Sequence, residues 1–271
     1  MTPHEMPSGS SPNSARQWRE LIDSSNLICR IAPGYEANLF RDSAQILMGE
    51  PHADMNFAFV GDAREAVRHL QVFAGYASKR SLPMMVLANE AAAPRLTEAT
   101  RSLGFTPAGA VPLMVCAEPR YGGTSAPYVI DRIRDHAVLR EATPHAARTF
   151  GLSLASVARV YNEDALAVAG VDYFVARRDS AIWSFVQTSR IGDAVGIWSM
   201  ATPPEHQGKG AGRALLEAVL AYHRQRGAER FFLCASPAGQ ALYQRVGFSE
   251  AATLAAWLSG ASSQLGASHG A

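Results

Sequence analysis

The chain has 271 residues, of which 48% are hydrophobic and 18% charged, and its formal net charge is +1. This apolar content is sufficient for a substantial core and excludes a mainly disordered chain. The near-zero net charge leaves no electrostatic footprint for nucleic acid or an anionic membrane surface. No uncharged apolar stretch reaches the roughly 18 residues that a membrane-spanning helix requires. The length fits one large domain or two small ones.

The cysteines and the first residues predict a cytoplasmic protein. Cys29, Cys116 and Cys234 lie far apart in the sequence, and an odd number of separated thiols is typical of a reducing cytosol. The first residues lack the basic and then apolar order of a secretory signal. No run of His, Cys or Asp has the spacing of metal ligands, so we expect no metal.

Both ends and one interior segment have the composition of tails and linkers. Residues 1–14 and 259–271 are small, polar and aperiodic, so we expect disordered tails there. Residues 118–128 contain two Pro and two adjacent Gly, which indicates a connection. We therefore expect a first domain at 15–117 and a second at 129–258.

The first half predicts alternating strands and helices. We expect strands at residues 56–60, 84–87 and 110–116, and helices at 63–79 and 92–102. The later part of the second half is predicted to have the same order of strands and helices, as described next.

The second half begins with three short runs rich in Val, Ile, Phe and Trp, at residues 171–177, 181–188 and 194–201. Turn residues separate these runs, and the spacing predicts a three-stranded antiparallel meander. An amphipathic helix is expected next at 212–226, because apolar side chains gather on one side and Gly227 is a natural stop.

A buried strand at 231–234, a helix at 238–245 and a last strand pair at 248–258 complete the second half. The order β-β-β-α-β-α-β predicts an α/β protein with a mixed sheet. Leu87 aligns with Leu233, and the Gly-Phe pair at 104–105 aligns with the pair at 247–248. A diverged tandem repeat explains these matches, and two unrelated α/β halves are the alternative.

The segment with the clearest chemistry is 202–216, which reads TPPEHQGKGAGRALL. Its glycines lie between a strand and a helix, where backbone N–H groups can approach a ligand closely. The helix N-terminus adds unpaired donors and a positive dipole end, and Lys209 and Arg213 add charge. The segment predicts a pyrophosphate cradle, with a glycine-rich turn without ligand as the alternative. A Walker loop and a dinucleotide fingerprint are excluded, because Gly210 follows Lys209 and residue 213 is Arg.

Two motifs in residues 194–248 resemble the GNAT (Gcn5-related N-acetyltransferase) superfamily. The family signature Gln/Arg-x-x-Gly-x-Gly/Ala is matched by Gln207, Gly210 and Gly212, after an Ala-Thr-Pro-Pro-Glu stretch at 201–205. About thirty residues on, the family's Leu-Tyr-x-x-x-Gly-Phe stands at 242–248. The resemblance implies two tandem GNAT-like domains with mostly antiparallel sheet and flanking helices, the first a degenerate copy.

The resemblance implies an acetyl-CoA-dependent N-acetyltransferase in which a primary amine attacks the thioester directly in a ternary complex. Tyr243 matches the family's candidate general acid, and packing against the sheet is its alternative role. The residues implied in cofactor binding are Met200, Ala201, Thr202, Gln207, Gly208, Lys209, Gly210, Ala211, Gly212, Arg213 and Ser236.

The first copy departs from the motif. Residues 61–66 align with the glycine segment 207–212 but carry Asp62 and Glu65, which place negative charge where a pyrophosphate would lie. We therefore expect acetyl-CoA to bind only the second half.

The catalytic base is not assigned by the sequence. Glu163 and Asp164 precede the meander, in the region that lines the acceptor site in the family, and Asp172 and Glu205 are weaker candidates. Cys234 is expected to be a small core residue rather than a nucleophile. The aromatic residues Trp183, Phe185 and Trp198 are expected to pack within the sheet, and one or two of them to wall the acceptor cleft.

The expected partner is a small-molecule or peptide amine, with no nucleic acid and no membrane, and the chain is expected to be a monomer or a homodimer. A sugar amine is one possible acceptor among tandem proteins of the family. A non-catalytic acetyl-CoA sensor is the alternative function.

Overall fold

The computed structural model describes residues 12–122 and 127–259. Within them the chain forms one sheet of 11 strands in the order β1-β2-β3-β4-β11-β5-β10-β9-β8-β7-β6. Only β3 with β4 and β9 with β10 pair in parallel among the described strands. The fold is therefore a mixed α/β architecture with a mostly antiparallel open sheet and flanking helices, as the sequence predicted.

The strands are β1 Glu36–Leu39, β2 Ser43–Leu47, β3 Asn56–Val60, β4 Met85–Ala88, β5 Thr106–Cys116, β6 Val129–Arg132, β7 Val171–Arg178, β8 Ala181–Ile191, β9 Ala194–Ala201, β10 Arg230–Cys234 and β11 Ser249–Leu258. The α-helices are α1 Pro12–Cys29, α2 Ala66–Ser78, α3 Ala93–Ser102, α4 His136–Phe150, α5 Leu154–Val160, α6 Ala211–Arg224 and α7 Pro237–Val246. Three short 3-10 turns are η1 Ala53–Met55, η2 Glu163–Ala167 and η3 Pro204–His206.

The predicted meander is confirmed, because β7, β8 and β9 pair antiparallel in sequence order. The predicted strand pair at 248–258 is wrong: this segment is the single strand β11, whose register shifts twice along β5. These irregularities let one long strand follow the twist of its partner without a turn. The helix predicted from residue 63 begins at Ala66.

The last strand of the chain lies inside the first half. β11 pairs with β4 on one side and β5 on the other, while β5 also pairs with β10. The two halves thus share one continuous sheet and exchange their long strands. The predicted connection at 118–128 joins β5 to β6, and its residues 123–126 lie outside the described part.

The predicted tails fall largely outside the described residues, which exclude 1–11 and 260–271. Helix α1 begins at Pro12, inside the predicted N-terminal tail. At the other end, the Ser259 amide donates to the Met84 carbonyl at 3.0 Å, so β11 is anchored beside β4.

Alternating side chains of the strands divide the core into two faces. In β7, Tyr173 and Val175 pack with α1, α4 and α5, while Phe174 and Ala176 pack with α6. In β3, Phe59 faces the α1 layer, and Ala58 and Val60 face α2 and α3. This period of two places one helical layer on each side of the sheet.

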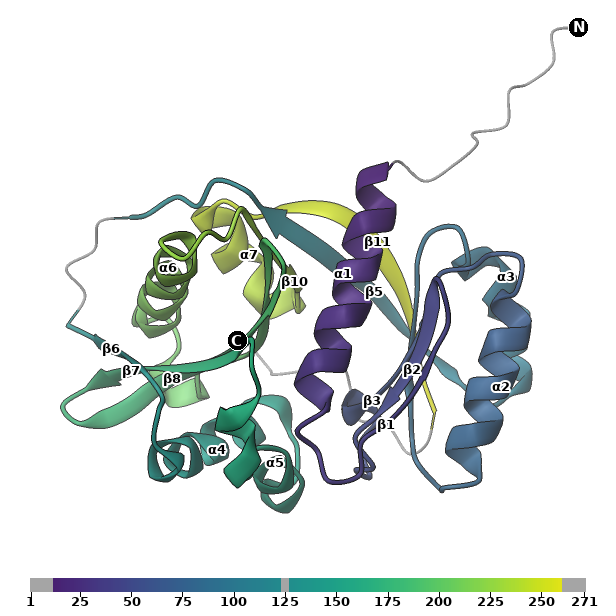
Figure 1. Cartoon of the computed structure of the whole chain (residues 1–271), viewed down its shortest axis with the longest axis horizontal. Helices are drawn as coiled ribbons and strands as arrows, with labels where there is room; N and C mark the ends of the chain where they lie inside the picture. The colour runs from purple at the N-terminus through teal and green to yellow at the C-terminus, as the bar shows by residue number, and fades with distance from the viewer. Residues whose placement is uncertain (1–11, 123–126, 260–271) are drawn as a thin grey trace, which may run out of the picture.

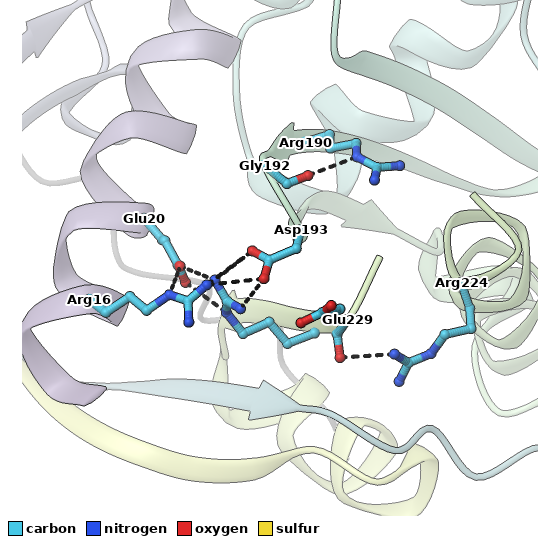
Figure 2. Close-up of polar contacts among 8 residues, drawn as sticks. Arg16, Glu20, Arg190, Gly192, Asp193, Arg224 and Glu229 are labelled. Atoms are coloured by element: carbon cyan, nitrogen blue, oxygen red, sulfur yellow. Dashed lines mark hydrogen bonds and ion pairs between the residues drawn. The ribbon is translucent and has the colours of Figure 1, made fainter. Parts of the chain in front are cut away.

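Helix α1 bridges the two halves (Figure 1). Figure 2 shows Arg16 and Glu20 of α1 directed toward Asp193, at the turn that enters β9. Arg230 of β10 donates to both oxygens of Asp193 at 2.9 Å and also bonds Glu20. This ion cluster fixes α1 against the β9–β10 pair. Among the described helices, none is long and apolar enough to cross a membrane.

Candidate functional site

The parallel strands β9 and β10 separate beyond their first residues. Their register pairs Ala194, Val195 and Gly196 with residues 230–232. Strand β9 continues to Ala201 without a further β10 partner in that register, whereas β10 continues along β5. The backbone of 197–201 therefore offers N–H and C=O groups to a ligand on this side.

A bulge in β9 accompanies the separation. The register with β8 shifts between Phe185 and Gln187, opposite Ser199 and Met200. Ser199 has a φ of 48°, a left-handed backbone conformation that is rare for a residue with a side chain. Strain of this kind is concentrated at functional sites.

The glycine segment forms an open loop that leads into α6. Gly208 and Gly210 have φ values of 72° and 87°, and a Cβ at either position would meet nothing within 4 Å. The positive φ values explain why glycine occupies these two positions, and the open space around them leaves the loop accessible to a ligand. The first amides of α6 have no intrahelical acceptor, and they carry the positive end of the helix dipole.

Gly212 packs α6 closely against the end of β9. A Cβ on Gly212 would lie 3.1 Å from Thr202 Oγ1, 3.4 Å from Met200 Cε and 3.7 Å from Leu242 Cδ2. The structure thus brings together the end of β9, the N-terminus of α6 and α7. These elements carry most of the residues that the sequence predicted.

Polar contacts hold the loop in place. Gln207 Nε2 donates to the Thr202 carbonyl at 2.9 Å, and Lys209 Nζ donates to the Glu205 carbonyl at 2.8 Å. The Tyr128 hydroxyl donates to the Lys209 carbonyl at 2.8 Å. These bonds use carbonyl oxygens as acceptors and hold the loop in place, and none of them uses an amide of residues 208–213.

Two predicted residues have clear structural roles. Ser236 is the N-cap of α7 and accepts from the Gly239 amide at 3.2 Å. Arg213 donates from Nε to Glu217 Oε1 at 2.7 Å and lies against Gly122. The positive charge of Arg213 is therefore shared with a neighbouring carboxylate.

Tyr243 lies on α7 with only 8% of its surface exposed. Its ring packs against Phe248 and so close to Gly239 that a Cβ there would meet the ring at 2.7 Å. Burial raises the pKa of Tyr243 to about 12, because the charged phenolate is poorly solvated. The hydroxyl is therefore protonated at neutral pH.

The corresponding region of the first half is closed. Strands β3 and β4 stay paired to their last residues, Val60 with Ala88. A Cβ on Gly61 would lie 2.1 Å from Trp18 Nε1, so α1 covers this position. Asp62 Oδ1 accepts from the Arg64 amide at 2.9 Å, so a carboxylate lies in the turn that leads into α2.

The sequence candidates for the base are dispersed. Asp172 accepts from Arg132 Nε at 2.7 Å, and Glu205 accepts from Arg148 at 3.0 Å. Glu163 and Asp164 lie in the turn η2. Burial raises the pKa of Cys234 to about 12, so its thiol is neutral and a poor nucleophile.

The three aromatic residues of the meander have different environments. Phe185 is fully buried, and Trp183 stacks on His206 with ring centroids 4.1 Å apart. Trp198 lines a cavity together with Ser199, on the α1 side of the sheet. The far wall of this cavity includes Asp54 from η1, a residue that the sequence did not single out. No local pattern marks Asp54, because its neighbours come from distant segments. No group of three or more potential metal ligands gathers within the described residues.

Comparisons with known proteins relate part of the second half to a known domain and the fold to solved structures. The sequence model of the acetyltransferase (GNAT) domain matches residues 169–250. No curated protein matches the sequence. A GCN5-related N-acetyltransferase from Kribbella flavida is 15% identical over 93% of this chain and 98% of its own, with a TM-score of 0.68.

Two other solved structures are similar. A GCN5-related N-acetyltransferase from Sphaerobacter thermophilus is 13% identical over 80% of this chain and 76% of its own, with a TM-score of 0.59. A glucosamine N-acetyltransferase region of a fungal multi-domain β-N-acetylglucosaminidase is 12% identical, with a TM-score of 0.61. The similarity covers 91% of this chain and 36% of that protein. At these identities the three structures share the fold.

Proposed function

This chain contains a GNAT domain and has the fold of the GCN5-related N-acetyltransferases, and from this premise we propose that it transfers acetyl from acetyl-CoA to a primary amine. The reaction takes place in the second half, between β9, α6 and α7. The observation that carries the proposal is the separation of β9 from β10 beside a glycine loop that leads into the N-terminus of α6.

The residues present fit acetyl-CoA. Amides at Gly208 to Arg213 bind the pyrophosphate, aided by the exposed charge of Lys209. The open space around Gly208 and Gly210 admits the phosphates. Backbone groups of residues 200–202 bind the pantetheine arm and polarise the thioester carbonyl. Oxyanion donors of this kind contribute roughly 3–4 kcal/mol to catalysis.

In the transfer step, the bound ammonium first loses a proton to solvent, and the neutral amine nitrogen then attacks the carbonyl carbon of the thioester. The C–N bond forms, the C–S bond breaks, and the electron pair of that bond leaves with sulfur. Tyr243 donates its phenolic proton to the thiolate and is reprotonated from solvent. The nitrogen releases its surplus proton to solvent or to a nearby carboxylate. The raised pKa of Tyr243 suits this role, since the proton is present throughout the neutral range.

We further propose that the first half is a degenerate copy of the same module. The order β3-α2-β4-α3-β5 matches β9-α6-β10-α7-β11, and each copy has one parallel pair. The closed strands and Asp62 argue that only the second copy binds acetyl-CoA.

The test is thiol release from acetyl-CoA in the presence of an amine panel, measured for the parent chain and for Tyr243→Phe. We expect turnover to fall roughly 100-fold or more, while the dissociation constant for acetyl-CoA changes less than about twofold. Tyr222→Phe, on α6, is the matched control and should retain both values.

Equal turnover in Tyr243→Phe would remove Tyr243 from the mechanism. Tight binding of acetyl-CoA with no amine-dependent thiol release for any amine would instead identify a non-catalytic sensor.

A further inference from the structure

A cavity of about 110 Å³ lies between the two halves of the chain. Met55 and Phe57 form one wall from the first half, and Phe150 and Val157 form another from α4 and α5. The strand β9 contributes Trp198 and Ser199, which immediately precede the backbone proposed to hold the thioester. The cavity therefore adjoins the reacting carbonyl from the side opposite α6.

The lining is mostly apolar. Eleven of its fourteen residues are aliphatic or aromatic, and the other three are Asp54, Gln187 and Ser199. Among the described residues that line it, none is Lys, Arg or His. A single carboxylate in an apolar wall favours a ligand that carries one positive charge on an apolar body.

Contacts between the halves hold the cavity in shape. Arg159 Nε of α5 donates to Glu50 Oε1 of the first half at 2.7 Å, and Glu50 is only 4% exposed. Asn162 Nδ2 donates to the Ile31 carbonyl at 2.9 Å. Trp198 Nε1 donates to Ser24 Oγ of α1 at 2.8 Å, which fixes the indole against the first half. These contacts preform the cavity, which lowers the entropic cost of binding.

We infer that the acceptor is a small primary amine with a short branched alkyl body, bound in this cavity with its nitrogen near Asp54 and Ser199. The inference rests on the proposed function and adds to it the class of acceptor. It also gives the first half a role, because that half supplies one wall of the acceptor site.

The volume limits the apolar body. A dry apolar cavity of about 150 Å³ holds benzene, so a cavity of about 110 Å³ admits an apolar body of only a few carbon atoms, such as the branched end of an isopentyl group. A sugar amine would place several hydroxyl groups against aliphatic walls that offer few partners, which is costly. Isopentylamine is therefore the probe, with methylamine and glucosamine as comparisons.

The first measurement is direct binding of each amine by calorimetry, without acetyl-CoA. We expect isopentylamine to bind at least tenfold more tightly than methylamine, because it buries more apolar surface, and glucosamine to bind no better than methylamine. The second measurement is thiol release from acetyl-CoA with the same three amines, where isopentylamine should have the highest kcat/KM.

Three variants test whether the amine binds in this cavity. Ala146→Leu, on the buried face of α4, should fill the space and reduce isopentylamine affinity at least tenfold. Ala137→Leu, on the exposed face of the same helix, should leave the affinity unchanged. Phe150→Ala, at a residue that is 37% exposed, removes one wall with little effect on folding and should also weaken binding. Thermal melting checks that each variant is folded.

The outcomes separate the two proposals. Cavity-dependent binding of isopentylamine without acetyl transfer would support an amine-binding cavity and contradict the proposed function, and with it the role of the amine as acceptor. Transfer to glucosamine or methylamine, with no preference for isopentylamine and no effect of Ala146→Leu or Phe150→Ala, would leave the proposed function intact and overturn the inference. Absence of isopentylamine binding would also overturn it.

Discussion

At the scale of single residues, His223 shows how the core restricts protonation. It lies on α6 with 2% of its surface exposed, and its Nε2 is 3.0 Å from Thr188 Oγ1. Burial lowers the pKa of His223 from 6.5 to about 4, because the charged imidazolium is poorly solvated there. The folded protein therefore keeps this side chain neutral at pH values where the unfolded chain binds a proton.

We predict that the free energy of unfolding decreases as the pH falls from about 6.5 to about 4. In this window the unfolded chain binds more protons than the folded one, so His223 alone contributes a slope of about 1.4 kcal/mol per pH unit. His223→Gln, which can retain the bond to Thr188, should remove this part of the slope. Urea unfolding at several pH values measures it, and an identical slope in both proteins would contradict the assignment.

At the scale of elements, hydrophobic periodicity predicts most of the strands and the helices α2, α3, α6 and α7. Helix α1 was not predicted, although Trp18, Leu21 and Ile22 have helical spacing. The signal is weakened by Ser24 and Ser25, which occupy fully buried positions. Ser25 Oγ donates to the Leu21 carbonyl at 2.8 Å, so these polar residues are accommodated by contacts that the sequence does not reveal.

The site was predictable only in part. The glycine loop and Tyr243 lie in local motifs of the sequence, and in the structure α6 and α7 meet at the end of β9. The cavity beside Trp198 was not predictable, because residues such as Asp54 and Phe150 are distant in sequence and meet only in the folded chain. The single strand β11 was predicted as a pair because a bulged strand carries an interrupted alternation.

The close packing of α1 on β9 gives a test at this scale. A Cβ on Gly196 would lie 2.5 Å from both Ser24 Oγ and Trp198 Nε1. We predict that Gly196→Ala lowers the free energy of unfolding by roughly 1–3 kcal/mol, since overpacking displaces buried neighbours.

Gly75→Ala is the matched control. Gly75 lies within α2, and a Cβ there would meet nothing within 4 Å. The same substitution should raise the free energy of unfolding by roughly 0.5–1 kcal/mol, because Ala favours the helix. Chemical denaturation compares the two, and equal effects would contradict the packing assigned to Gly196.

At the scale of the whole molecule, the two halves exchange strands and form one continuous sheet. β5 and β11 lie side by side across the centre of the sheet (Figure 1). The cluster around Asp193 ties α1 to the second half, and Arg230 lowers the pKa of the Asp193 carboxyl to about 2 by hydrogen bonding. The first half therefore presents a fixed wall to the cavity beside Trp198.

The central claim is that the chain has one acetyl-CoA site, formed by the loop before α6. Isothermal titration with acetyl-CoA measures it, using Lys209→Glu and, as the control, Lys79→Glu; these are the two lysines of the chain, and both are exposed. We predict one site per chain, weakened roughly tenfold or more by Lys209→Glu through loss of a charge-assisted contact, and unchanged in Lys79→Glu. Two sites, no binding, or equal affinity in the two variants would contradict the account.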